Sequence, residues 1–233
     1  MGGGAIPSRD TFDTDLGTVR QRVADALERT LRRATRAERE KLFHARGDLA
    51  ERALHATRAY LDGSAPLMEA WRRYEGVVWR HLDPATLETA QRARILVPSA
   101  LYGLTSANDV IADYRLRMSV RLKSLGPLAN FWKAPLSSAL IAHVGEATVV
   151  DLLPDEHAGA VDLGALSEAT ALVRVSFVDQ KRHRAVGHAA KAVKGVLARC
   201  LVLEGLAGLE DFAWEGWRLE GRDGGFVAVS PGT

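Results

Sequence analysis

Two groups of cationic side chains carry most of the chemistry that the sequence offers. From Tyr114 to Lys123, apolar residues alternate with polar ones, and four of the polar residues are cations: Arg115, Arg117, Arg121 and Lys123. Strict alternation is typical of a strand with one buried face. A row of guanidinium groups on the other face suits phosphates or carboxylates, because arginine presents a planar fork of donors. The pattern taken alone favours a simpler interpretation, a solvated strand edge whose charges discourage aggregation.

The second group lies between His188 and Arg199, where the spacing predicts a helix. Lys191, Lys194 and Arg199 share one broad face, opposite an apolar face that includes Cys200. Cations in the first turn of a helix oppose the helix dipole, and an anion bound there would explain this placement. His188 is the natural acid or base, because histidine titrates near neutral pH. The alternative is that these are ordinary surface lysines.

Three further polar residues precede the first group and could line the same site: Ser99, Tyr102 and Asp109. Ser99 follows a short apolar run, residues 95–97, that predicts a buried strand, and a polar turn is expected over residues 105–109. Ser99 and His188 could form a nucleophilic triad with an aspartate such as Asp109 or Asp151 only by coincidence of the fold. A buried serine and a hydrogen-bonded histidine are the expected outcome.

Hydrophobic periodicity predicts the elements that position these residues. A helix with an apolar stripe is expected after a cap at Thr14-Asp15, from the spacing of Leu16, Val19, Val23, Leu27 and Leu31. Further helices are expected over residues 37–61, 67–78 and 84–93 and from residue 128, and strands over residues 148–153, 172–178 and 225–229. Residues 184–188 are expected to form a hairpin with the strand at 172–178.

The composition is that of a globular protein with a substantial core, since 47% of the 233 residues are hydrophobic. A formal net charge of +2 does not indicate a nucleic-acid binder, so such a role depends on local patches. The single cysteine excludes an intrachain disulfide and favours a reducing cytoplasm. The sequence has no membrane-spanning run, signal-peptide core, P-loop, dinucleotide fingerprint or zinc-protease motif.

The stretch from residue 94 to residue 122 also resembles the YaaA peroxide-stress family. That signature reads Ser-(Gly/Ala)-Leu-(Tyr/Trp)-Gly, a loop with Arg-Pro-x-Asp, and Tyr-Arg-Leu-x-Met. The residues that fit it are Ser99, Ala100, Leu101, Tyr102, Gly103, Asp109, Ile111, Tyr114, Arg115, Leu116 and Met118. Ser106-Ala107, Asp113 and Arg117 depart from it. The segment from His188 to Arg199 is similar to the family's His-x-x-Lys-x-x-(Lys/Arg)-Gly-x-x-x-Arg.

The resemblance covers most of the chain from Tyr74 to Leu219 and suggests a divergent member of actinobacterial type. It implies one α/β (mixed α+β) domain over residues 1–233, with a curved mixed sheet wrapped by helices and a flexible N-terminus at residues 1–12. It also implies a helix-hairpin-helix near residues 189–216. The chain begins about where the family's first strand and its loop would end. Either the chain has a different start or this member has lost that strand, and a loss would also remove part of any cleft.

Three functions remain open at this point. A cytoplasmic peroxide-stress protein would bind double-stranded DNA or another phosphate-bearing ligand through a basic cleft. An enzyme would act on a small anionic or nucleotide-like substrate, with His188 as acid or base and Arg115 and Lys191 holding the anion. A folded remnant would serve as an interaction module with an exposed sheet edge. The oligomeric state stays open.

The expected ligand-binding residues are common to the first two functions. They are Ser99, Tyr102, Asp109, Tyr114, Arg115, Lys191, Lys194 and Arg199. We expect no cofactor and no bound metal, because the sequence offers no recognisable ligand set for iron or zinc.

Overall fold

The computed structural model describes residues 11–178, 190–222 and 224–230. Its α-helices are α1 (Asp13–Arg33), α2 (Arg36–Phe43), α3 (Gly47–Asp62), α4 (Ala70–Arg73), α5 (Val77–Leu82), α6 (Thr89–Arg92), α7 (Leu128–Val144), α8 (Asp155–Ala158), α9 (Leu163–Ala169) and α10 (Ala190–Glu204). Its 3-10 helices are η1 (Pro84–Thr86) and η2 (Gly205–Leu209). Its strands are β1 (Leu67–Glu69), β2 (Leu96–Ser99), β3 (Gly103–Ser106), β4 (Val110–Ala112), β5 (Arg121–Leu122), β6 (Gly126–Pro127), β7 (Val149–Asp151), β8 (Leu172–Val178), β9 (Ala213–Trp214), β10 (Trp217–Arg222) and β11 (Gly225–Val229).

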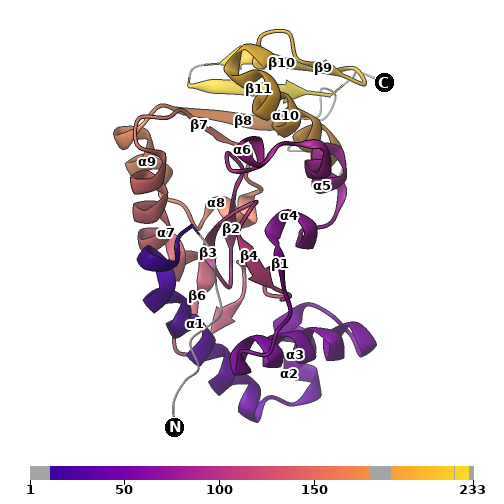
Figure 1. Cartoon of the computed structure of the whole chain (residues 1–233), viewed down its shortest axis with the longest axis vertical. Helices are drawn as coiled ribbons and strands as arrows, with labels where there is room; N and C mark the ends of the chain where they lie inside the picture. Colours follow the sequence, from indigo (N-terminus) through magenta and orange to yellow (C-terminus); the bar gives the residue numbers. More distant parts are fainter. Residues whose placement is uncertain (1–10, 179–189, 223, 231–233) are drawn as a thin grey trace.

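A five-stranded sheet lies at one end of the molecule, at the top of Figure 1, in the order β7-β8-β11-β10-β9. Strand β8 pairs in parallel with β7 and β11, whereas β10 pairs antiparallel with β11 and β9. Helix α10 covers this sheet, and its Val193 and Leu197 share a buried cluster with Val175 and Phe177 of β8. The expected mixed α/β fold with a curved mixed sheet is therefore confirmed. The hairpin partner predicted for β8, residues 184–188, lies outside the described residues.

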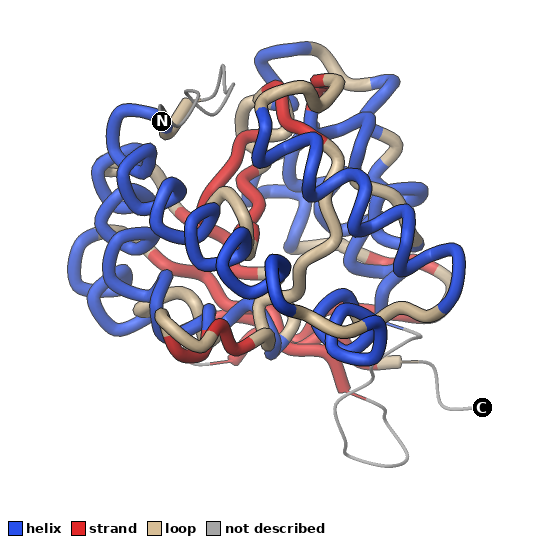
Figure 2. Tube along the Cα trace, turned by 90° about the horizontal axis from the view of Figure 1, so that it is seen from below, coloured by secondary structure: helices blue, strands red, loops and turns tan. Residues whose placement is uncertain are grey.

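The larger core lies below this sheet and is built from α1, α7 and the β2–β3 hairpin. Helix α1 follows its predicted stripe, and Leu16, Val23, Leu27 and Leu31 are all buried. These residues belong to one cluster with Trp132 of α7. Figure 2 shows strands running through the middle of the molecule between helices, with further strands along its lower edge. Helix α1 begins at Asp13, one residue before the predicted cap at Thr14-Asp15. The side chain of Phe12, just before this helix, is buried in the core.

Helices α2 and α3 form a corner at the end of the molecule opposite the five-stranded sheet (Figure 1). They confirm the helical stretch predicted over residues 37–61, and the chain turns between them at residues 44–46. Thr35 and Glu38 form a reciprocal capping box that fixes the start of α2. His44 ends α2 in the left-handed conformation, with φ of 46°.

The strand predicted from Tyr114 to Leu122 is wrong over most of its length, since only Arg121 and Leu122 lie in β5. The alternation does survive in burial: Met118, Val120 and Leu122 are buried, and the residues between them are exposed. From Met118 to Val120, backbone groups instead form hydrogen bonds with a side chain and with the start of a helix. The backbone N–H of Ser119 donates to the Glu156 carboxylate, and the carbonyl of Val120 accepts from Leu128 at the start of α7. Alternating burial therefore did not require a neighbouring strand.

Two helical predictions are also corrected. Residues 67–78 form β1 and α4 before α5 begins, because β1 pairs antiparallel with β4. The second helix of the expected helix-hairpin-helix is absent, since η2 follows α10 and the chain then enters β9. Aromatic residues favour strands, and here Trp214 pairs with Trp217 across β9 and β10.

In the part of the chain that the structure describes, no helix has both the length and the apolar character needed to cross a membrane.

Candidate functional site

Ser99 begins a chain of buried hydroxyl groups. Its Oγ accepts hydrogen bonds from the backbone N–H groups of Leu101 and Tyr102, at 3.3 and 3.0 Å. Its single proton therefore goes to the hydroxyl of Tyr114, at 2.8 Å. The Tyr114 hydroxyl lies 3.1 Å from that of Tyr74. Because its proton is already used in this chain, Ser99 is poorly suited to act as a nucleophile.

The two tyrosines of this chain remain neutral phenols. Burial raises the pKa of Tyr114 well above its ordinary value, and the neighbouring Tyr74 raises it further. Burial also raises the pKa of Tyr74, against hydrogen bonds from Thr105 and Tyr114 that lower it. Both can therefore donate or accept hydrogen bonds at neutral pH, but neither is a ready base.

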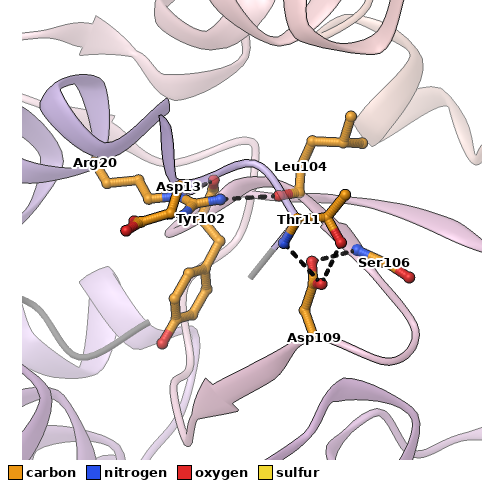
Figure 3. A network of polar contacts seen from close by, with 7 residues as sticks. All are labelled: Thr11, Asp13, Arg20, Tyr102, Leu104, Ser106 and Asp109. Carbon is orange, nitrogen blue, oxygen red and sulfur yellow. Dashed lines mark hydrogen bonds and ion pairs between the residues drawn. The ribbon is translucent and has the colours of Figure 1, made fainter. Parts of the chain in front are cut away.

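Tyr102 and Asp109 hold the fold together around the β3 hairpin (Figure 3). The Tyr102 hydroxyl accepts from the backbone N–H of Ala112 at 2.9 Å. Both oxygens of Asp109 accept hydrogen bonds, from Thr11 at 3.0 and 2.6 Å and from the backbone of Ser106 at 2.6 Å. Arg20 of α1 donates to the carbonyl of Tyr102 at 2.7 Å. The ligand-binding role predicted for these two residues stays a prediction, and their side chains already have partners within the protein.

Gly103 of the family signature allows β3 to pack closely against α7. It adopts a φ of +77°, and a Cβ on it would lie 2.5 Å from a ring carbon of Trp132. The indole Nε1 of Trp132 donates to the carbonyl of Ala100 at 2.9 Å. These residues position β2 and β3 on α7, so much of the signature is architectural.

A small cavity of about 280 Å³ opens beside the tyrosines. We call it the guanidinium pocket, and its lining residues are Arg73, Tyr74, Asp113, Tyr114, Arg115, Leu116 and Arg117. Arg115 is fixed by hydrogen bonds to the carbonyls of Phe43 at 2.9 Å and His44 at 3.3 Å. Arg73 is fixed in the same way by the carbonyls of Ile111 and Pro66. Each guanidinium keeps further N–H donors for a ligand.

The side chain of Arg117 is exposed and makes no hydrogen bond or ion pair with the described residues. The positive charge of Arg117 helps to lower the pKa of the Glu156 carboxyl. Burial raises the pKa of the Glu156 carboxyl, but hydrogen bonds from Ser119 and the charges of His157 and Arg117 bring it below its ordinary value. Arg117 is therefore the most available of the three arginines.

A second, larger hollow of about 820 Å³ adjoins the first through Arg117. We call it the corner hollow, because it lies at the turn between α2 and α3. Its lining residues are Ala37, Glu40, Lys41, His44, Ala45, Arg46, Leu49 and Arg117. Glu40 accepts from Arg36 and from the backbone of Gly47, both at 3.3 Å. The side chains of Lys41 and Arg46 make no hydrogen bond or ion pair with the described part of the chain.

Two cations of α10, Lys194 and Arg199, lie elsewhere and bond to backbone carbonyls of the fold. Lys194 donates to the carbonyls of Leu152 and Leu153 at 3.1 and 3.3 Å. Burial lowers the pKa of Lys194, against the charges of Asp151 and Asp155. Arg199 donates to the carbonyls that end α5, Leu82 at 3.0 Å and Asp83 at 3.2 Å. Cations stabilise the negative end of a helix in this way.

The predicted site residues therefore form two separate groups. Ser99, Tyr102, Tyr114 and Arg115 come together, and α10 lies near the other end of the molecule (Figure 1). Lys191 is exposed, and His188 lies outside the described residues. Four pocket residues were not predictable from the sequence, because their segments carry no signal except local charge: Lys41, His44, Arg46 and Arg73. Among the described residues, no three His, Cys, Asp or Glu side chains are grouped to hold a metal ion.

Comparison with known proteins places these residues in a family. Residues 8–222 match the family model described as peroxide stress protein YaaA. A UPF0246 protein of Streptomyces coelicolor is 36% identical over 139 residues, which cover 58% of this chain and 53% of that protein. One from Caulobacter vibrioides is 31% identical over 210 residues, covering 83% and 81%. The chain thus spans only about half the length of some relatives, such as the Streptomyces protein at 53%. On the extent of the model match, the chain belongs to the YaaA peroxide stress protein family.

Proposed function

We propose that this protein binds a small ligand bearing a phosphate or carboxylate group in the guanidinium pocket. The observation that carries the proposal is that three arginines line one concave space with a single carboxylate, Asp113. Arginine suits such anions because its fork of donors can bind two oxygens at once. A concave space favours a small ligand over a broad polymer surface.

The anchoring of the arginines supports the same proposal. Arg73 and Arg115 are each held by two backbone carbonyls, so they lose little side-chain freedom when an anion binds. Tyr74 and Tyr114 line the same pocket, and because both stay neutral they add no charge that would repel an anion.

We infer a role for this binding in the peroxide-stress response that gives the family its name. The single cysteine supports a cytoplasmic location. Turnover of the bound molecule would require an acid or base. His188 remains the predicted candidate for that role.

Duplex DNA is a second candidate, favoured by the charge of the corner. Residues 29–58 contain nine arginines and lysines against four acidic residues, whereas the whole chain has a net charge of only +2. A basic surface of this kind attracts phosphate backbones at low salt. The exposed helices α2 and α3 would then carry the contacts.

Equilibrium dialysis with radiolabelled inorganic phosphate tests the primary proposal. Arg117→Ala removes an exposed side chain that has no partner among the described residues and should fold normally, yet it should weaken binding by about tenfold or more. Lys191→Ala is the matched control, since it removes another exposed cation, from α10, and should leave binding unchanged. Absence of binding at low salt, or equal weakening by both variants, would contradict the proposal. A labelled duplex measured by fluorescence anisotropy across a salt series tests the DNA candidate.

A further inference from the structure

The corner hollow offers space that a bare phosphate does not need. We propose that it receives the nucleoside part of a nucleotide whose phosphate lies against Arg115 and Arg117. This inference rests on the proposed function, because it assigns the phosphate to the guanidinium pocket. It adds the class of ligand, which nothing in the family comparison assigns.

The sizes of the two spaces separate the two parts of the ligand. The guanidinium pocket measures about 280 Å³, whereas the corner hollow measures about 820 Å³. Pockets for organic ligands occupy roughly 300–1,000 Å³. The first space therefore suits an anionic group, and the second suits a larger organic body. Arg117 lines both, so a single molecule can reach from one to the other.

The lining of the corner hollow suits a heterocyclic base with its sugar. Ala37, Ala45 and Leu49 give it an apolar part, and the Leu49 side chain is 44% exposed although it is a large hydrophobic residue. Lys41, His44 and Arg46 supply a polar part. Flat rings pack on apolar side chains and on guanidinium planes, while cationic donors meet the acceptor atoms of a base edge. A base inside a duplex cannot present its face in this way, which favours an unpaired nucleotide.

The backbone of the corner gives independent support. His44 has a φ of 46°, in the left-handed region where helix ends usually place glycine. Backbone strain of this kind persists only where the surrounding structure holds it, and such residues often cluster at ligand sites. Arg115 holds the carbonyls of Phe43 and His44, so the guanidinium pocket and the corner hollow are braced by the same side chain.

Isothermal titration calorimetry with inorganic phosphate, adenosine monophosphate and adenosine tests the inference. The wild type should bind adenosine monophosphate about tenfold more tightly than phosphate, since the base adds buried area. Leu49→Ser should remove this gain and leave phosphate affinity unchanged. Leu203→Ser is the matched control, because Leu203 is similarly exposed at 47% but lies on α10.

His44→Gly separates a ligand contact from a structural role. Glycine relieves the left-handed backbone, so the variant should be as stable as the wild type or more stable by about 1 kcal/mol. It should nevertheless weaken the binding of adenosine monophosphate severalfold, without weakening phosphate binding. Unchanged nucleotide binding in both His44→Gly and Leu49→Ser would overturn the inference.

The outcomes also distinguish this inference from the proposed function. Phosphate binding without any gain for adenosine monophosphate overturns the nucleotide assignment alone. Absence of binding for both compounds overturns the proposed function and this inference together. A single-stranded oligonucleotide with a terminal phosphate, used as competitor, identifies the source: displacement of adenosine monophosphate supports a strand end, and no displacement supports a free nucleotide.

Discussion

Ser99 shows how one hydroxyl can set the direction of a whole hydrogen-bond chain. It accepts from two backbone N–H groups, so its proton must go to Tyr114. The Tyr114 proton is then directed to the hydroxyl of Tyr74, which also lies 3.4 Å from Thr105. Two tyrosines that line the guanidinium pocket, Tyr74 and Tyr114, are therefore held in place by a chain of neutral, oriented hydroxyls. The sequence predicted that Ser99 is buried, but the order of this chain depends on contacts between residues far apart in sequence.

Removing the Ser99 hydroxyl should be costly. Ser99→Ala leaves two buried N–H groups and the Tyr114 hydroxyl short of a partner, so we expect a loss of about 1–3 kcal/mol in the free energy of unfolding. Ser167→Ala removes an exposed hydroxyl and should change stability by less than about 0.5 kcal/mol. Urea unfolding of both variants measures the difference. Similar stability in the two would show that the chain contributes little.

His157 predicts a pH dependence of folding. Burial lowers its pKa, against the charge of Glu156, and its Nδ1 is buried without a hydrogen-bond partner among the described residues. Below the usual histidine pKa of about 6.5, the unfolded chain therefore binds a proton that the folded chain does not. Stability should fall as the pH drops through this range.

The variant His157→Phe isolates this effect, because it removes the titrating group but keeps a ring. The wild type should lose more stability than His157→Phe between about pH 7 and about pH 5. Thermal unfolding across this range gives the comparison. Parallel pH profiles for the two proteins would mean that His157 titrates alike in the folded and unfolded states.

At the scale of elements, α5 and α10 pack closely against each other. Gly195 allows it, since a Cβ there would lie 2.3 Å from the carbonyl oxygen of Val78 and 2.7 Å from Cβ of His81. Arg199 then caps α5 one turn further along. The stretch from Lys191 to Arg199, which resembles the family motif, thus contains residues needed to join two helices.

Gly195→Ala should force α5 and α10 apart and lower stability by about 1–3 kcal/mol. Gly17→Ala is the matched control in α1, where the new methyl would meet only an ordinary contact at 3.6 Å. It should raise stability by about 0.5–1 kcal/mol, because alanine is the better helix former. Guanidinium unfolding of the two variants should therefore give changes of opposite sign. A neutral Gly195→Ala would contradict the close packing of these helices.

The predictable elements were those with a long periodic signal. The stripe of α1 and the apolar runs of β8 and β11 identified these elements from sequence. The segment from Tyr114 to Val120 was wrongly predicted as a strand, because its side chains alternate in burial. Its backbone instead forms hydrogen bonds with the start of α7 and with the Glu156 side chain. Only tertiary contacts distinguish a true strand from an irregular segment whose side chains are alternately buried and exposed.

At the scale of the whole molecule, the candidate site joins segments that are distant in sequence. The turn between α2 and α3, the end of α4 and the loop from Asp113 to Arg117 meet around two adjoining hollows. The sequence predicted Tyr114 and Arg115, because a family motif marked them. It could not predict Arg73, His44 or Arg46, because their roles arise only when the corner packs against that loop. Nor could it show that Lys194 and Arg199 are bound to backbone carbonyls.

The central claim is that the guanidinium pocket binds an anion of the phosphate type. Crystals soaked with tungstate, a heavy phosphate analogue with a strong anomalous signal, test it most directly. The account predicts an anomalous peak within hydrogen-bond reach of Arg115 and Arg117, and its loss in Arg117→Ala. A peak at Lys191 with none at the guanidinium pocket, or no peak in the wild type, would contradict the account.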